Sequence, residues 1–510
     1  MRLLVFDHYF AHDIEALAHA APYDEIGQLF VTRVVNLAQY YFPPDAFEGL
    51  TGPYKPAYVA NHEKWARRVC RLMAAIRRKF VFDAFVLPSD TYFYIRPAIR
   101  WAQANGIPCI IVQKETSVSP WTLDVHSTQM GTYYPFIADA MAVCSERHKS
   151  FWLRAGAPAE KISVTGQPRF DFYSQPERWR RLDSVNLPPS AERRKTILFL
   201  SYDIRAYVPT DDDSDVASSQ GGSPLTWASL HLQTMQALLD LVASERYRLL
   251  IKPHPQQSAK QIANMKEHIL SSGLGLGKDV FVLSELADAR QLIVNADVVV
   301  GFQTTALYEA MAAGKPVIYT FWGNEVSTLQ DTLLPFHSYP EDVLLCARSG
   351  DHLKELVLEA ASTRSTQQQM RARKLICEEH LGPLDGRATQ RVLHMIHELT
   401  SARASHKPSI RGSDIGRQVM EGMAQEVHHL SGVMSRNLWH SLRAMLRPME
   451  HRRVLWRMHR LAAERERRQV VELAAENIAL CRTKVERLPR PYRKTRPIEQ
   501  HEGPIARTRG

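Results

Sequence analysis

Long apolar runs and paired cysteines are both missing from this chain of 510 residues. No apolar run reaches the roughly 18 residues that a membrane-spanning helix needs. The first residues, MRLLVFDHYF, contain an acid and lack the long apolar core of a secretory signal, so we expect none. Hydrophobic residues make up 45% and charged residues 23% of the chain, which is the composition of a globular protein.

The six cysteines are scattered and form no CxxC pair: Cys70, Cys109, Cys144, Cys346, Cys377 and Cys481. This spacing offers neither a structural zinc site nor a disulfide framework, and it is typical of a reducing compartment. We therefore expect a cytoplasmic protein without a structural metal. An acidic pair, Asp211 and Asp213, lies in a low-complexity stretch, which we interpret as a solvated loop rather than a metal site.

Basic residues are concentrated near the C-terminus. Residues 401–510 hold 23 Lys+Arg and 11 Asp+Glu, a balance of +12, whereas the whole chain carries +10. Apolar positions at helical spacing over 433–482 include Trp439 and Trp456, and the following segment is rich in Pro and Arg. Such a basic helix can lie on an anionic membrane, so 433–496 is a candidate membrane-binding segment. A hairpin packed on the body and an interaction arm are the alternatives. No aromatic-basic recognition motif accompanies the charge, so we expect no nucleic acid partner.

Before residue 400, near-continuous apolar strands alternate with helical patterns. We expect strands at 2–6, 82–90, 107–113, 139–145, 196–203, 247–255, 279–285, 296–302 and 315–321. This alternation predicts parallel β/α units whose sheets are covered on both faces. A polar stretch at 174–195 interrupts it, so we expect two Rossmann-like lobes: an acceptor lobe at 1–170 and a nucleotide-donor lobe at 171–402. The basic helical tail, 403–510, follows them, and its end is expected to be disordered.

A histidine between two prolines follows one of these strands, in "RLLIKPHPQQS". Pro253 and Pro255 fix the backbone on both sides of His254, and they prevent the chain from continuing as a helix or an inner strand. Histidine held at a strand end can donate to a phosphate and stabilise a departing nucleotide. Lys252, at the end of the same strand, and Ser201, at the end of the strand before it, are candidate phosphate ligands. A structural histidine in a strand-ending proline pair is the alternative for the motif taken alone.

A second pattern is "GFQTTALYEAMAAGKPVIY", residues 301–319. After a buried strand come three candidate phosphate ligands, Gln303, Thr304 and Thr305, and a helix begins near residue 306. Threonine hydroxyls can cap that helix, and its free N–H groups favour an anion such as phosphate. Glu309, one turn into the helix, can accept hydrogen bonds from the two hydroxyls of a ribose. Gly314 is expected to end the helix.

These two segments and "KISVTGQPRFD" (161–171) resemble the GT-B transferases of bacterial surface polysaccharide assembly. The most similar groups are CDP-glycerol glycerophosphotransferases and capsule glycosyltransferases, with nucleotide-sugar 2-epimerases more distant. The resemblance covers about residues 100–400, and it also includes the closing segment "EEHLGPLDGRATQRV" (378–392). It implies an inverting, metal-independent transfer with no cofactor, in which His254 supports the leaving phosphate. Thr304 and Thr305 would bind that phosphate, and Glu309 would bind the ribose.

The resemblance implies a donor linked to CMP, CDP or UDP and a polysaccharide or lipid-linked acceptor. A 2-epimerase and a non-catalytic assembly component remain the alternative functions. The chain departs from the family at Lys114 and Glu115, where many relatives have His-Gly, and in lacking an acidic motif that supplies the base in sialyltransferases. An inverting transfer needs a base from the first lobe. Glu115 is the preferred candidate because it follows the longest buried strand, and Asp90 and His8 are the others.

Overall fold

The computed structural model describes residues 1–404 and Val419, apart from 8–9, 23, 49–50, 115–117, 121, 176–193, 205–225, 245–246, 256, 285–286, 330–332, 342 and 363–364. His8, Glu115, the acidic pair at 211 and 213, and the candidate membrane segment 433–496 therefore lie outside the described residues.

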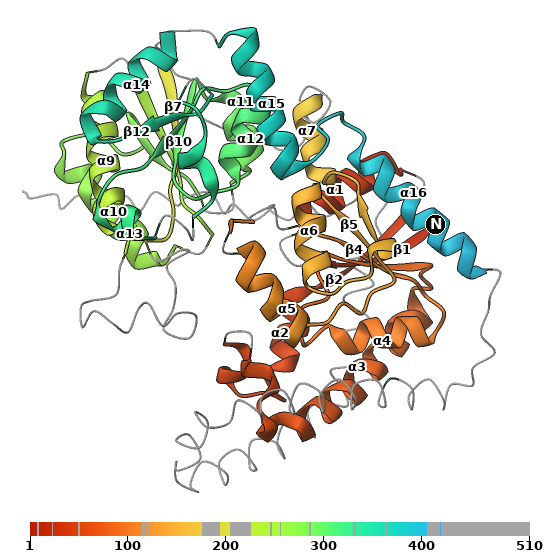
Figure 1. Ribbon diagram of the computed structural model, residues 1–510. Helices are drawn as coiled ribbons and strands as arrows, with labels where there is room; N and C mark the ends of the chain where they lie inside the picture. The colour runs from red at the N-terminus through yellow and green to blue at the C-terminus, as the bar shows by residue number, and fades with distance from the viewer. Residues whose placement is uncertain are drawn as a thin grey trace, which may run out of the picture.

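The first lobe contains a six-stranded parallel sheet with the order β2-β1-β3-β4-β5-β6 (Figure 1). Its strands are β1 (Arg2–Asp7), β2 (Glu25–Phe30), β3 (Ala84–Leu87), β4 (Cys109–Val112), β5 (Ala140–Val143) and β6 (Ile162–Val164). Its helices are α1 (Ala11–Ala20), α2 (Val31–Ala38), α3 (Val59–Lys79), α4 (Arg96–Ala104), α5 (Ser127–Tyr133), α6 (Glu146–Arg154) and α7 (Asp171–Ser174).

The second lobe contains another six-stranded parallel sheet, with the order β12-β11-β10-β7-β8-β9. Its strands are β7 (Lys195–Leu200), β8 (Tyr247–Lys252), β9 (Val280–Val282), β10 (Val298–Gly301), β11 (Val317–Thr320) and β12 (Leu345–Ala347). Its part of the chain holds helices α9 (Ala228–Ala243), α10 (Ala259–Ser271), α11 (Ala289–Asn295), α12 (Ala306–Ala312), α13 (Asn324–Leu329), α14 (Gly350–Ser362) and α15 (Gln367–Leu381), and α16 (Ala388–Ala404) follows them.

Most residues of the inner strands are buried, because helices cover both faces of each sheet. All residues of β3, β4, β5, β10 and β11 are buried, and these four-residue strands contain one polar side chain, that of Thr320. The nine expected strands are confirmed, and they correspond to β1, β3, β4, β5, β7, β8, β9, β10 and β11. Sequence analysis missed β2, β6 and β12, which are edge strands of the two sheets. An edge strand has one neighbour, so its sequence needs no continuous apolar run.

The first sheet separates two hydrophobic clusters. Alternate residues of β1 point to opposite sides: Leu4 and Phe6 join the cluster beneath α3 and α4, and Leu3 and Val5 join the other. That second cluster is completed by α16, which contributes Val392, Leu393 and Ile396. Figure 1 shows α16 lying beside α1, close to the N-terminus. The sequence division groups residues up to 402 with the second lobe, but this last helix packs on the first.

The motif GQPRFD (166–171), which lies between the strands of the first sheet and those of the second, also holds α16 in place. The carboxylate of Asp171 accepts hydrogen bonds from the backbone N–H groups of Ala388 (3.0 Å) and Thr389 (2.9 Å) and from the Thr389 hydroxyl (2.6 Å). It therefore caps α16 from a distant part of the chain. Gly382, before α16, has φ of +81°, and a Cβ there would lie 1.6 Å from the carbonyl oxygen of Cys144. Only glycine fits at this crossing.

An ion-pair network around the buried Arg290 joins α1 of the first lobe to α11 of the second lobe. One Arg290 nitrogen, Nη2, donates to Glu15 Oε2 (2.9 Å), Asp288 Oδ2 (2.9 Å) and His12 Nδ1 (2.8 Å). The guanidinium also lies 5.1 Å from the ring centroid of Phe172, which belongs to residues 166–174, the connector that follows the strands of the first lobe. Burial raises the pKa of Asp288, but the charge and hydrogen bonds of Arg290 outweigh this and hold that pKa at about 2. At neutral pH Asp288 and Arg290 are therefore both charged.

Within the described residues, no helix has both the length and the apolar character needed to cross a membrane. The five cysteines of this part are free thiols.

Candidate functional site

The second sheet has a topological switch point between β7 and β10. From β7 the chain proceeds to β8 and β9 on one side, whereas β10, β11 and β12 lie on the other. In open α/β sheets, ligands bind beyond the carboxyl ends of the strands at such a point. Leu200 at the end of β7 pairs with Lys252 of β8 and with Gly301 of β10. This register places the polar segments that follow all three strands at one edge of the sheet.

The KPHP motif forms a tight turn after β8. The backbone N–H of His254 donates to Gln257 Oε1 (2.8 Å), and its carbonyl accepts from the Gln257 N–H (2.9 Å). Ser258 then caps α10 by accepting from the Gln261 N–H. The His254 residue is half-buried, while Lys252 is 9% exposed and its ammonium donates to the Pro253 carbonyl (3.2 Å). The turn holds the backbone of His254 at the sheet edge, as the two prolines predict.

Ser201, directly after β7, is paired with a histidine that sequence analysis did not identify. Its Oγ lies 2.8 Å from Nε2 of His231, in the first turn of α9. Ser201 is 3% exposed, and its backbone N–H donates to the Lys252 carbonyl (3.0 Å). Burial, aided by the nearby His268, lowers the pKa of His231 to about 4. The imidazole is therefore neutral at pH 7 and holds the Ser201 hydroxyl in one direction.

Three candidate phosphate ligands follow β10. The side chain of Gln303 is hydrogen-bonded inside the protein, and those of Thr304 and Thr305 are partly exposed. Gln303 adopts φ of +45°, and its amide bonds Tyr319 Oη (2.7 Å) and the backbone N–H of Leu334 (2.8 Å). This places the Gln303 side chain in the core and leaves its backbone at the turn. Thr304 and Thr305 are half-buried, and Thr304 Oγ1 accepts from the Ala306 N–H at 3.3 Å. The helix α12 begins and ends where expected, with φ of +71° at Gly314.

Glu309 faces the connector between the lobes. It is 8% exposed, and its Oε2 accepts a hydrogen bond of 2.6 Å from the hydroxyl of Tyr173 in α7. Burial and the adjacent carboxylate raise the pKa of Tyr173 well above its usual value, so the phenol stays a donor. The expected ribose ligand is therefore oriented by a residue of the connector.

In the first sheet the switch point lies between β1 and β3, beside Asp7 and Asp90. Asp90 is fully buried, and its Oδ2 accepts from the backbone N–H of Ile137 (2.8 Å). Burial raises its pKa. Asp7 is partly exposed and its pKa is also raised by burial, against a hydrogen bond from the Phe10 backbone. The carbonyl of Lys114, which precedes Glu115 in sequence, accepts from Arg169 Nη2 (3.1 Å) and therefore touches the connector.

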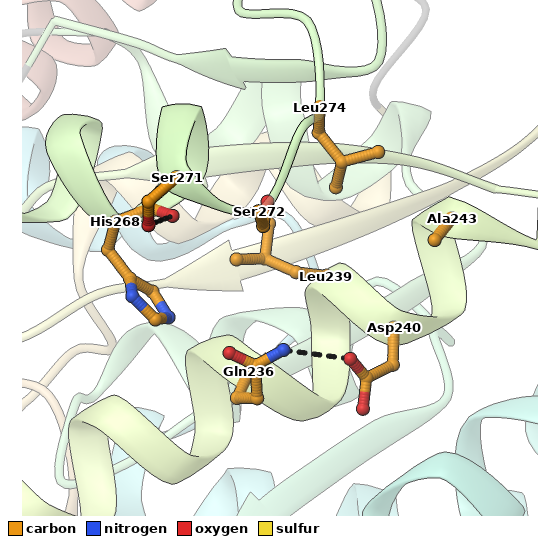
Figure 2. A pocket seen from close by; sticks show the side chains of 8 residues that line it. All are labelled: Gln236, Leu239, Asp240, Ala243, His268, Ser271, Ser272 and Leu274. Atoms are coloured by element: carbon orange, nitrogen blue, oxygen red, sulfur yellow. Dashed lines mark hydrogen bonds between the residues drawn. The ribbon is translucent and has the colours of Figure 1, made fainter.

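A pocket of about 300 Å³ lies between α9 and α10, and Figure 2 shows its lining. His268 and Asp240 lie on its opposite sides, and Gln236 Nε2 donates to Asp240 Oδ1 (2.8 Å). Both helices run antiparallel to the strands, so their C-terminal ends lie at the amino edge of the sheet. This pocket is therefore at the edge opposite to the switch point and does not include the candidate site.

Sequence analysis missed His231 and Tyr173 because neither belongs to a recognisable motif. The signal available for Tyr173 was its place two residues after the PRFD motif (168–171). His231 lies in an ordinary helical pattern that gives no indication of its contact with Ser201.

Two Rossmann-like lobes, with the last helix of the described core returning to the first lobe, define the GT-B fold expected from the sequence. No family model and no curated protein matches the chain. Among solved structures, it is similar to the UDP-GlcNAc 2-epimerase from Neisseria meningitidis bound to UDP-GlcNAc: 12% identity, 78% of this chain and 100% of the other covered, TM-score 0.43. It is similar to a variant of the wall teichoic acid polymerase TagF: 12% identity, 79% and 90% covered, TM-score 0.47. It is also similar to a glycosyltransferase from Rickettsia africae: 14% identity, 78% and 98% covered, TM-score 0.41.

Proposed function

We propose that this chain transfers a sugar or polyol-phosphate unit from a nucleotide-activated donor to a surface polysaccharide or lipid-linked acceptor. The observation that supports this most directly is the strand register of the second sheet. It collects Ser201, the Lys252–His254 turn and the Thr304–Thr305 pair at one switch point, with Glu309 one helical turn away. Hydroxyls and basic side chains at one edge suit a phosphate, and a carboxylate beside them suits a ribose.

In the proposed reaction, the bond between the transferred unit and the terminal nucleotide phosphate oxygen breaks. The acceptor oxygen forms the new bond to the transferred unit, and the nucleotide leaves with the bonding electron pair. His254 and Lys252 stabilise the negative charge that develops on that phosphate, together with the hydroxyls of Thr304 and Thr305. Because these side chains supply the charge, we expect activity without a metal ion. Unchanged turnover with EDTA is the expected result, and loss of activity contradicts this part of the proposal.

The proton of the acceptor hydroxyl must pass to a base on the first lobe. Glu115 remains the preferred candidate, with His8 second. Asp90 is the weakest of the three, because its carboxyl is buried and its Oδ2 bonds the Ile137 backbone. A Glu115→Gln variant is expected to keep nucleotide affinity and lose at least about a hundredfold in turnover, the lower end of what general-base catalysis contributes. Unchanged turnover would move the assignment to His8.

The first experiment measures the melting temperature against CMP, CDP, UMP, UDP and GDP. A ligand present at 100 times its dissociation constant adds about 2.7 kcal/mol of stability. We expect a selective shift with one nucleotide, reduced in His254→Ala. The matched control is His394→Ala, whose side chain is 74% exposed on α16, and which should shift like the wild type. No shift with any nucleotide contradicts the proposed function and favours a non-catalytic assembly component.

A second measurement separates transfer from epimerisation. The chain is incubated with the activated donor whose nucleotide gives the shift, with and without a polysaccharide acceptor. Acceptor-dependent release of the nucleotide supports transfer. Conversion of the donor sugar to its 2-epimer, with no dependence on acceptor, identifies an epimerase instead.

A further inference from the structure

The exposed side of α3 in the first lobe carries a row of cations, which we call the cationic ridge. Lys64, Arg67, Arg71 and Arg78 are all exposed, and their spacing of three, four and seven residues places them along one stripe of the helix. The stripe from the first to the last of them is about 21 Å long at 1.5 Å per residue. Lys79 continues it at the C-terminal end.

Few acids balance this charge. Glu63 is the one acidic residue in α3, and it pairs with Arg67 at 3.7 Å. Burial lowers the pKa of Arg68, on the neighbouring stripe, to about 10, and the positive charge of Arg71 adds to that effect. The arginines therefore repel one another. A protein surface that gathers cations in this way fits an anionic partner.

The ridge is rigidly supported and has apolar side chains at both ends. The opposite side of α3 packs into the core through Trp65, Val69, Leu72, Met73 and Ile76, each at most 2% exposed. Val59 at the start of the helix is 38% exposed, and Val81 just after its end is 45% exposed. Exposed apolar side chains beside cations suit the interface of a lipid bilayer better than they suit a soluble polyanion.

The last described residue before the basic C-terminal segment lies in the same lobe. Val419 is 1% exposed and belongs to the hydrophobic cluster that α3 covers. Residues 420–510, which follow it, contain 19 Lys+Arg and 10 Asp+Glu. In Figure 1, α3 lies on the side of the first lobe that faces away from the second lobe. A flat partner bound there leaves the strand ends of the second lobe accessible.

We propose that the cationic ridge of α3 docks the first lobe on an anionic lipid bilayer, as a surface distinct from the C-terminal segment. The headgroup phosphates pair with Arg67, Arg71 and Arg78, while Val59 and Val81 enter the interfacial region. This inference does not rest on the proposed function, because lipid binding requires no donor nucleotide.

The test is co-sedimentation of the full chain with vesicles of phosphatidylcholine, alone or with about one third phosphatidylglycerol. The ridge variant is Arg67→Glu/Arg71→Glu/Arg78→Glu. The matched control is Lys260→Glu/Lys266→Glu/Lys278→Glu, which reverses three exposed lysines of the second lobe and changes the net charge equally. Melting temperature and far-ultraviolet circular dichroism verify that each variant is folded. If the ridge variant fails to fold, the three residues are changed to Gln instead.

The wild type is expected to bind the anionic vesicles alone and to be released at about 1 M salt, where the Debye length falls to about 3 Å. The ridge variant should bind at least about tenfold more weakly, and the control should bind like the wild type. Unchanged binding by the ridge variant, or an equal loss in both variants, overturns the proposal. A preference of the wild type for soluble polyphosphate or RNA over the vesicles overturns it as well.

Discussion

The two lobes have sheets of the same size, but they are completed in different ways. The second lobe has one hydrophobic core, built from residues between 170 and 381. The first lobe has its main core in two clusters, and one of them is closed by α16, whose residues follow the whole second lobe in sequence. The first lobe therefore cannot finish folding before the second has been traversed. The packing of the first lobe and the position of the second lobe both depend on the two segments that pass between the lobes, around Asp171 and around Gly382.

The polar residues at the strand ends differ in the same way. In the second lobe, His254, Thr304 and Thr305 are partly exposed beside the switch point. In the first lobe, Asp90 is buried against backbone N–H groups, and Asp13 in α1 accepts from Arg169 N (3.1 Å) of the connector. In the first lobe, Asp13 and Asp90 therefore hold the lobe and its connector together, whereas His254, Thr304 and Thr305 of the second lobe are partly exposed at the edge of the sheet.

The largest effect is expected from Gly382→Ala, in the segment that passes from the second lobe back to the first. The new Cβ would overlap the carbonyl of Cys144 in the first lobe, so we expect a loss of more than about 4 kcal/mol in the free energy of unfolding. Gly273→Ala is the matched control, because Gly273 has a similar φ of +77° and nothing within 4 Å of its Cβ position. That change should cost only about 1 kcal/mol of backbone strain. Equal losses in urea unfolding would show that the crossing is not sterically constrained.

The next effect concerns the cap of α16. Asp171→Ala removes three hydrogen bonds that reach from the connector to the first turn of α16, and we expect a cost of about 2–3 kcal/mol. Thr366→Ala removes a cap of α15 that is local in sequence, and it should cost about 1 kcal/mol. Thermal unfolding of the two variants compares a long-range cap with a local one. A smaller cost for Asp171→Ala would mean that α16 is held by its apolar contacts alone.

A pH titration tests the ion-pair network between the lobes. The pKa of Asp288 is about 2 in the folded chain and about 3.8 in the unfolded chain. Because the folded value is lower, the carboxylate stabilises the fold at pH values above about 5, and this contribution of about 2 kcal/mol disappears as the pH falls towards 2. Asp288→Asn keeps a helix-capping side chain and should flatten this part of the stability curve. Asp351→Asn, at an exposed ion pair, should leave the curve as it is, and a similar change in both variants would contradict the assignment.

The smallest effect is expected from Tyr173→Phe. Under the proposed function, losing the hydrogen bond to Glu309 should weaken nucleotide binding about fivefold, equivalent to about 1 kcal/mol. Tyr58→Phe breaks a similar tyrosine–carboxylate bond, to Asp45 in the first lobe, and should leave affinity unchanged. Calorimetric titration of both variants measures this difference. An unchanged affinity for Tyr173→Phe would assign that hydroxyl to the joint between the lobes alone.

Much of the candidate site was predictable, because its signals lie within a few residues. The prolines around His254 and the glycine after α12 restrict the backbone locally, and the apolar runs before them mark buried strands. The partners of these residues were not predictable. The contact between Ser201 and His231 depends on how α9 packs on β7, and the amide of Gln303 turned out to bond Tyr319 and Leu334 in the core.

By itself, the sequence determined the alternation of strands and helices, the two lobes and the polar residues that end the strands of the second lobe. Periodicity, proline and glycine act over one or two turns of chain, so these features can be read locally. Only the tertiary structure decided that α16 belongs to the core of the first lobe and that Asp171 caps it from 217 residues away. Such contacts depend on which surfaces remain to be buried after each lobe has formed, and no local pattern contains that information.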